Sequence, residues 1–162
     1  MQKLEMRRQT NNDGMLSQVY IDAPFENWGL TVKNTPAYTF VPTTVHGIQG
    51  IVQYAKANGK RVRASGYRHT WSPLYSETNE ILVSMLDLAI ATAVPDPSSL
   101  LPNAIHKGNE LKVIEPFERD MAGFEGQKRL VKVGAAVTNE ELRRWAIAKN
   151  EWTIPVNVIM VE

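Results

Sequence analysis

The chain contains no cysteine, and this absence excludes several kinds of chemistry within its 162 residues. Disulfide bonds, cysteine-ligated metals and cysteine nucleophiles all need a thiol that this chain does not have. Charge of one sign is also scarce, because 18 Lys and Arg residues are balanced by 17 Asp and Glu residues, for a formal net charge of +1. A nearly neutral chain has no electrostatic reason to bind nucleic acid or an anionic membrane, so we expect neither partner.

Long hydrophobic runs are missing as well. No stretch approaches the roughly 20 apolar residues that cross a bilayer. Residues 1–14 are polar and lack the apolar core of a secretory signal, so we expect a cytoplasmic location. The hydrophobic fraction of 43% and the charged fraction of 22% are those of a globular protein. A chain of this length is sufficient for a domain with its own core.

Periodicity and turn residues predict an α+β organisation. The clearest helix spans residues 44–58, with Thr44 as its N-cap and Gly59 after its end. Apolar residues recur at helical spacing on the face expected to cover the sheet: Val45, Ile48, Ile51, Val52 and Ala55. A second helix is expected to open with a capping box, Thr138-x-x-Glu141. Strands are expected at 18–21, 30–33, 60–64, 80–86, 111–114 and 130–133, a loop at 91–108, and an exposed hairpin or insertion at 115–128.

The most informative stretch is an acid-free turn that follows the strand expected at residues 60–64. It reads Arg63-Ala64-Ser65-Gly66-Tyr67-Arg68-His69-Thr70-Trp71. Small residues at Ser65 and Gly66 leave the backbone accessible, and successive backbone N–H groups in such turns bind anions. Two interpretations are open from these residues alone. The turn is either a phosphate-binding loop or an ordinary strand-to-loop connection with a surface histidine.

The order of motifs around this turn resembles the vanillyl-alcohol oxidase family of flavoenzymes. Residues 40–45, Phe-Val-Pro-Thr-Thr-Val, precede a helix, a strand and the loop at 66–70, which is similar to the family's Gly-x-x-His-Ser/Thr loop. Residues 130–142 resemble the family's strand, Gly-Ala-Gly turn and helix, with Ala136 in place of the second glycine, and residues 153–155 resemble a Leu-Pro that follows. Trp71-Ser72 is similar to the sugar-lactone and alditol oxidase branch. The chain departs from the family at Tyr67 and Arg68, where small residues are usual.

The resemblance covers residues 38–162 and implies a PCMH-type FAD-binding domain, namely its first subdomain and the start of its second. Residues 1–37 are then an N-terminal arm, either a disordered tail or a strand that covers the domain. In many members of the family the loop histidine is bonded covalently to the flavin 8α-methyl group, which implies covalent FAD at His69. The cofactor-binding residues are expected to be Pro42, Arg63, Ser65, Gly66, Tyr67, Arg68, His69, Thr70 and Pro155. No metal site is expected, since His46, His69 and His106 lack metal-ligand spacing.

The activity implied by the resemblance is oxidation of a CH–OH group in a sugar, lactone, polyol or related alcohol. Oxygen would be the acceptor in an oxidase, and another acceptor would serve in a dehydrogenase. No catalytic residue is expected in this chain. The apolar run at 152–161 carries no stop signal, so we expect a second chain, the C-terminal remainder of the same polypeptide, to pair with it and complete the FAD site. The alternative is a non-catalytic α+β binding or interaction module whose histidine loop is incidental.

Overall fold

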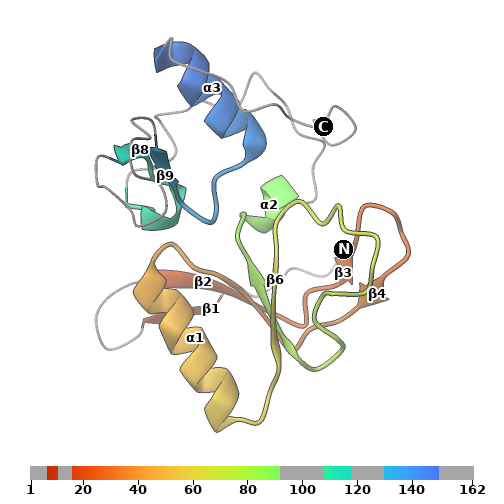
Figure 1. Ribbon diagram of the computed structural model, residues 1–162. Coiled ribbons are helices and arrows are strands. Elements are labelled where there is room, and N and C mark those ends of the chain that lie inside the picture. Colours follow the sequence, from red (N-terminus) through yellow and green to blue (C-terminus); the bar gives the residue numbers. More distant parts are fainter. Residues whose placement is uncertain (1–6, 11–15, 92–107, 118–129, 150–162) are drawn as a thin grey trace, which may run out of the picture. The chain divides into compact units, whose positions relative to one another are not determined.

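The computed structural model describes residues 7–10, 16–91, 108–117 and 130–149 (Figure 1). The chain divides into two compact units between Ala93 and Val94, and each unit is described by itself. The described residues form helices and strands in mixed order, so the predicted α+β class is confirmed. None of the helices among them combines the length and the apolar character that a membrane span requires.

The first unit is built on a five-stranded sheet in the order β1-β2-β5-β7-β6. Its strands are β1 (Arg7–Thr10), β2 (Leu16–Ile21), β5 (Tyr38–Val41), β6 (Val62–Ser65) and β7 (Ile81–Ser84). Strands β1, β2 and β5 pair antiparallel, whereas β5, β7 and β6 run parallel. A separate two-stranded pair consists of β3 (Phe25–Glu26) and β4 (Lys33–Asn34). Residues expected to form an arm thus contribute strands, and β2 is bonded directly to β5.

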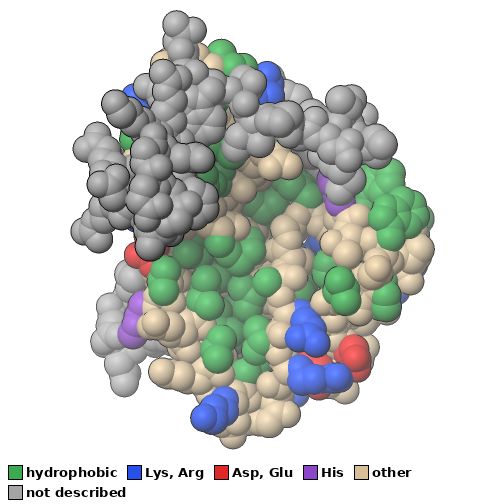
Figure 2. All heavy atoms as spheres, in the orientation of Figure 1, with side chains coloured by type: hydrophobic (Ala, Val, Ile, Leu, Met, Phe, Trp, Pro, Cys, Tyr) green, Lys and Arg blue, Asp and Glu red, His purple; other side chains and the backbone are tan. Residues whose placement is uncertain are grey.

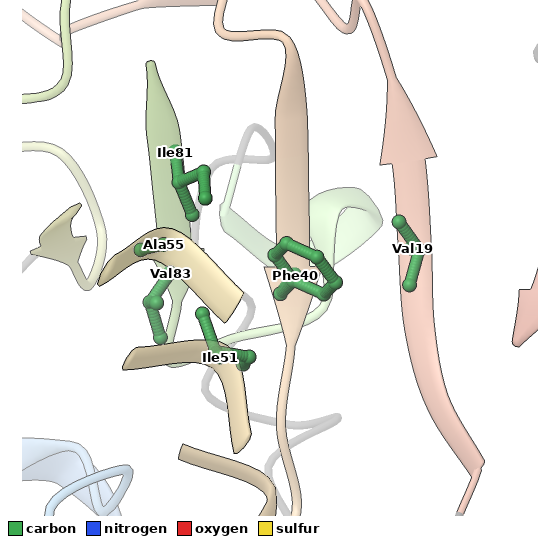
Figure 3. Close-up of a cluster of buried hydrophobic side chains, with 6 residues drawn as sticks. All are labelled: Val19, Phe40, Ile51, Ala55, Ile81 and Val83. Carbon is green, nitrogen blue, oxygen red and sulfur yellow. The ribbon is translucent and has the colours of Figure 1, made fainter. Parts of the chain in front are cut away.

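Helix α1 (Val45–Ala57) covers one face of this sheet (Figure 1). Thr44 caps its N-terminus, since Thr44 Oγ1 accepts a hydrogen bond of 2.9 Å from the Gly47 N–H. Side chains from the helix and from three strands meet in one buried cluster (Figure 3): Val19, Phe40, Ile51, Ala55, Ile81 and Val83. The predicted packing of this helix on the sheet is therefore confirmed.

Two residues assigned to the buried face of α1 lie exposed instead. Val45 is 54% exposed and Val52 is 50% exposed. At about 100° per residue, both fall to one side of the stripe that Ile51 and Ala55 form. The buried stripe is narrower than the run of apolar residues suggests.

Several strand limits also differ from those expected. Strands β6 and β7 cover parts of the expected ranges, and β4 begins only at Lys33. The short helix α2 (Leu88–Ala91) reaches the first residue of the expected loop at 91–108, and residues 92–107 lie outside the described residues.

In the second unit, the strand expected at 111–114 is wrong. Residues Glu110–Lys112 form the 3-10 turn η1, because Asn109 Oδ1 accepts a hydrogen bond of 3.0 Å from the Leu111 N–H and closes the turn. The strand β8 follows at Ile114–Phe117 and pairs antiparallel with β9 (Leu130–Val133). Residues 118–129, most of the expected hairpin, lie outside the described residues.

Helix α3 (Asn139–Lys149) opens with the predicted capping box. The Thr138 N–H donates to Glu141 Oε2 at 2.7 Å, and the Glu141 N–H donates to Thr138 Oγ1 at 3.1 Å. The other oxygen of Glu141 accepts a bond of 2.8 Å from Lys112 Nζ, and both side chains are buried. Burial alone raises the pKa of Glu141, but the bonds from Lys112 and Thr138 outweigh it, so the pKa lies below its usual range.

Replacing Lys112 by Met should lower the free energy of unfolding by about 3–5 kcal/mol near neutral pH, because Glu141 would remain buried without its cation. The folded pKa of Glu141 is depressed, so its contribution is present above the unfolded value of about 4.3 and is lost as pH falls through the folded pKa. The difference between Lys112→Met and the native protein should therefore shrink in acid. Urea unfolding at several pH values measures it.

The matched control is Lys132→Met. Lys132 pairs with Glu115 at 2.7 Å, but both side chains are about half exposed or more, so this variant should lose at most about 1 kcal/mol. Equal losses in the two variants would show that burial of the Lys112–Glu141 pair does not matter.

Candidate functional site

The candidate site begins at the carboxyl edge of the parallel strands in the first unit. Strand β7 lies between β5 and β6, in the register Phe40↔Val83 and Ser65↔Ser84. The three strands therefore end at the same edge of the sheet, which is where open sheets with parallel strands bind ligands. Pro42 follows β5 there, and the expected loop follows β6, roughly 10 Å away at two strand spacings. Both Pro42 and Ser65 are buried.

We call residues 65–71 the histidine turn. His69 of this turn is flanked by Arg68 and Thr70, and both of these residues contact the aromatic pair Phe25 and Tyr75. The ring centroids of that pair lie 4.6 Å apart. On one side the Arg68 guanidinium carbon lies 4.5 Å from the centre of the Phe25 ring. On the other side the Tyr75 hydroxyl accepts from the Thr70 N–H at 2.9 Å and donates to the Thr70 carbonyl at 3.1 Å. Phe25 and Tyr75 are buried with Leu82, so the turn packs against a buried hydrophobic cluster.

Arg68 lies on the buried side of the turn. Its side chain is 6% exposed, and its φ of 63° is in the left-handed region. Burial lowers the pKa of Arg68, and Tyr75 offsets part of this effect. A guanidinium nevertheless stays charged at neutral pH. The sequence suggested a cation near a phosphate, and the structure places this cation over an aromatic ring.

A second segment, residues 27–31, fixes the turn from the side. The buried Asn27 donates from Nδ2 to Thr31 Oγ1 at 2.9 Å and to the Thr70 carbonyl at 3.0 Å. The Trp28 N–H donates to the Arg68 carbonyl at 2.9 Å, and Thr31 Oγ1 donates to the Trp71 carbonyl at 3.2 Å. The sequence alone does not indicate these residues as part of the site. Gly29 marks a turn there, but nothing local indicates contacts with residues about 40 positions away.

The imidazole of His69 lies among aromatic rings. It stacks on Tyr67 with a centroid distance of 5.9 Å and an interplanar angle of 26°, and it meets Trp28 edge-on at 5.9 Å. Trp28 also meets Trp71 edge-on at 5.9 Å, and Gly29 leaves room for that ring, since a Cβ there would lie 2.8 Å from it. Both indoles stay more than 60% exposed. On the face of the molecule drawn in Figure 2, other hydrophobic side chains are exposed as well.

The turn offers hydrogen-bond donors without partners, which is the pattern that an anionic ligand requires. Within the described residues, Ser65 Oγ and Arg68 Nε are buried and have no hydrogen-bond partner. No hydrogen bond among these residues uses the N–H groups of Gly66, Arg68 or His69. The Thr70 N–H is different, because it is bonded to Tyr75. The backbone N–H groups and the Ser65 hydroxyl fit a phosphate group, which accepts such hydrogen bonds, whereas Arg68 Nε lies on the buried side of the turn.

The remaining expected site residues are placed as follows. Arg63 is exposed on β6, and Gly66 has open space around the position of a Cβ. Pro155 lies outside the described residues. Among the residues that the structure describes, no group of three His, Asp or Glu side chains could hold a metal ion.

Comparisons with known proteins identify the fold. No protein-family model matches the chain, and no curated protein sequence matches it significantly. Two solved structures are similar: a solvent-stable cholesterol oxidase, with 19% identity, and cholesterol oxidase from B. sterolicum, with 15% identity, each at a TM-score of 0.55. The matches cover 91% and 92% of this chain but only 22% and 23% of those proteins. At these identities the similarity is one of fold.

Proposed function

We propose that this chain is the N-terminal, FAD-binding part of a flavin-dependent oxidoreductase that oxidises a CH–OH group. The observation that carries the proposal is the set of unpartnered donors in the acid-free histidine turn, at the carboxyl edge of parallel strands. The similarity in fold to two cholesterol oxidases, whose name states the oxidation of an alcohol, supports the same class. The chain spans less than a quarter of either protein, so the activity of the whole protein is part of the proposal.

In this proposal the histidine turn binds the FAD pyrophosphate. The N–H groups of Gly66, Arg68 and His69 and the hydroxyl of Ser65 donate to its oxygens, and Arg63 adds positive charge. Helix α1 begins just after Pro42 at the same edge, and its N-terminal dipole favours an anion. Tyr67, Thr70, Pro42 and Pro155 complete the contacts to the cofactor. Bound FAD would supply the redox chemistry, while this chain supplies placement and electrostatics.

We also propose the finer features that the sequence resemblance implies. The domain is of the PCMH type, and His69 is bonded covalently to the flavin 8α carbon. The 8α-methyl group and the His69 ring nitrogen would each give up one hydrogen for that bond, and dioxygen would be the oxidant that takes up the two protons and two electrons released, as hydrogen peroxide. The C-terminal remainder of the polypeptide, as a second chain, supplies the catalytic base and the rest of the FAD site. The chain is expected to act in the cytoplasm on a small-molecule alcohol. Because its net charge is nearly neutral, neither nucleic acid nor a membrane is expected as a partner.

The variant Gly66→Val tests the turn. A Cβ at this position would meet nothing within 4 Å, and the backbone of Gly66 is not in the left-handed region. We therefore expect a change in the free energy of unfolding within about 0.5 kcal/mol. Flavin loading should be lost, because the isopropyl group occupies the space through which a phosphate would approach the N–H groups. Flavin absorbance per protein, after purification with added FAD, measures loading.

Ala64→Val is the control, because it adds a similar side chain at an exposed position of β6, one residue outside the turn. It should load flavin as the native protein does. Normal flavin content in Gly66→Val would refute the assignment of the pyrophosphate to this turn.

The covalent bond predicts one flavin-modified peptide. Acid precipitation should leave the flavin with the protein, and mass spectrometry after trypsin digestion should place its mass on the peptide that contains His69. The variant His69→Asn should keep FAD bound without the covalent bond, because the phosphate donors are mainly backbone groups. Flavin released intact by acid from the native protein would disprove the bond but would leave non-covalent binding open.

A substrate panel tests the activity. The sequence favours sugars, aldonolactones and polyols through Trp71-Ser72, and the two similar structures add sterols. Each alcohol should be mixed anaerobically with the flavin-loaded protein and its C-terminal remainder, and bleaching of the flavin should be recorded. Peroxide formation on admission of air then distinguishes an oxidase from a dehydrogenase. Failure of every alcohol class to reduce the flavin would count against the class of enzyme.

A further inference from the structure

Arg68 adopts a backbone conformation that residues with a side chain rarely take. Its φ is 63°, and glycine is the usual residue in such turns. A residue held there against steric cost must be over-determined by its surroundings. The structure supplies such a contact, since the guanidinium carbon lies 4.5 Å from the centre of the Phe25 ring and the side chain is 6% exposed.

The same residue is linked both to His69 and to Trp28, whose ring contacts the imidazole. His69 follows it directly in the chain, and the His69 ring contacts both Tyr67 and Trp28, at a centroid distance of 5.9 Å from each. The Trp28 N–H is bonded to the carbonyl of Arg68 at 2.9 Å. A change in the backbone at Arg68 would therefore move the imidazole and the adjoining Trp28 together.

Arg61, an exposed arginine of the same unit, is held differently. Arg61 is 59% exposed and forms ion pairs with Glu77 and Glu80 at 2.6 and 3.4 Å. Surface ion pairs of this kind contribute little. A cation over an aromatic face, shielded from water, interacts more strongly. The contact between Arg68 and Phe25 thus has the strength to set a backbone conformation.

We propose that Arg68 is a positioning residue for His69: its guanidinium, packed on Phe25, holds the left-handed turn that places the imidazole against Tyr67 and Trp28. This inference rests on the proposed function for its purpose, since there His69 is the attachment point of FAD. Arg68 acts on the attachment through His69. Thr70, the next residue in the chain after His69, is bonded through its backbone to Tyr75.

The first test needs no flavin. The chain has three histidines, so the ring protons of His69 can be identified by NMR through their loss in His69→Asn. Neighbouring aromatic rings should displace these resonances from their positions in the denatured protein. Arg68→Gly keeps the left-handed preference but removes the anchor, and it should move the resonances toward the denatured values. Arg68→Lys, which keeps a cation, should retain more of the displacement, and Arg61→Met should leave the resonances unchanged.

The second test follows flavin attachment. With added FAD, the rate at which acid-stable flavin appears should fall by about 10- to 100-fold in Arg68→Gly, because a misplacement of about 1 Å costs rates of this order. Phe25→Leu should show a similar loss, and Arg68→Lys a smaller one. Thermal unfolding and total bound flavin are measured in parallel. A merely structural role would lower stability and total flavin but leave the attachment rate per bound flavin unchanged, whereas positioning lowers the rate per bound flavin at saturating FAD.

The outcomes separate the two proposals. If the native protein binds no flavin, the proposed function fails, and the NMR comparison still decides whether Arg68 positions His69. Native-like His69 resonances and a native-like attachment rate in Arg68→Gly would overturn the inference, since the backbone preference alone would then suffice. If Arg68→Gly does not fold, Arg68→Lys and Phe25→Leu decide. Equal behaviour of those two variants would overturn the inference as well.

Discussion

The candidate site depends on one packed contact, the aromatic pair Phe25 and Tyr75 under the histidine turn. Their rings lie 4.6 Å apart in a buried cluster with Leu82 of β7, an interior strand of the sheet. This pair binds the residue on each side of His69, one by its ring face and the other by its hydroxyl group. The loop that follows β6 is thereby attached to β7, whose four residues are all buried, and its unpartnered donors are held in place before any ligand binds.

The same contact explains why the residues before β5 belong to the site. Phe25 lies in β3, and the adjacent segment 27–31 bonds to the backbone on either side of His69. Strand β2 pairs antiparallel with β5. The segment that follows β2 therefore lies beside the parallel strands. Segment 27–31, which the sequence places in the expected N-terminal arm, supplies Trp28 beside the imidazole and two of the side-chain hydrogen bonds that reach the turn, from Asn27 and Thr31.

Much of the architecture could be predicted because its signals are local. Thr44 and the capping box at Thr138 were read correctly, since a cap depends on side chains within three or four positions of each other. The strand expected at 111–114 was wrong for a related reason. The side chain of Asn109 closes a 3-10 turn over residues that are apolar enough to suggest a strand. Val45 and Val52 were misplaced because periodicity does not show how much of a helix face the sheet will cover.

The sequence by itself determined the α+β class, the principal helix of each unit, and a turn of small residues, cations and one histidine without acids. These features arise from neighbours in the chain, so composition and spacing are enough to show them. Only the tertiary structure decided that Arg68 points into the fold over Phe25 and that Trp28 borders His69. These contacts join residues about 40 positions apart, and the packing of β3 and β7 beneath the turn brings them together.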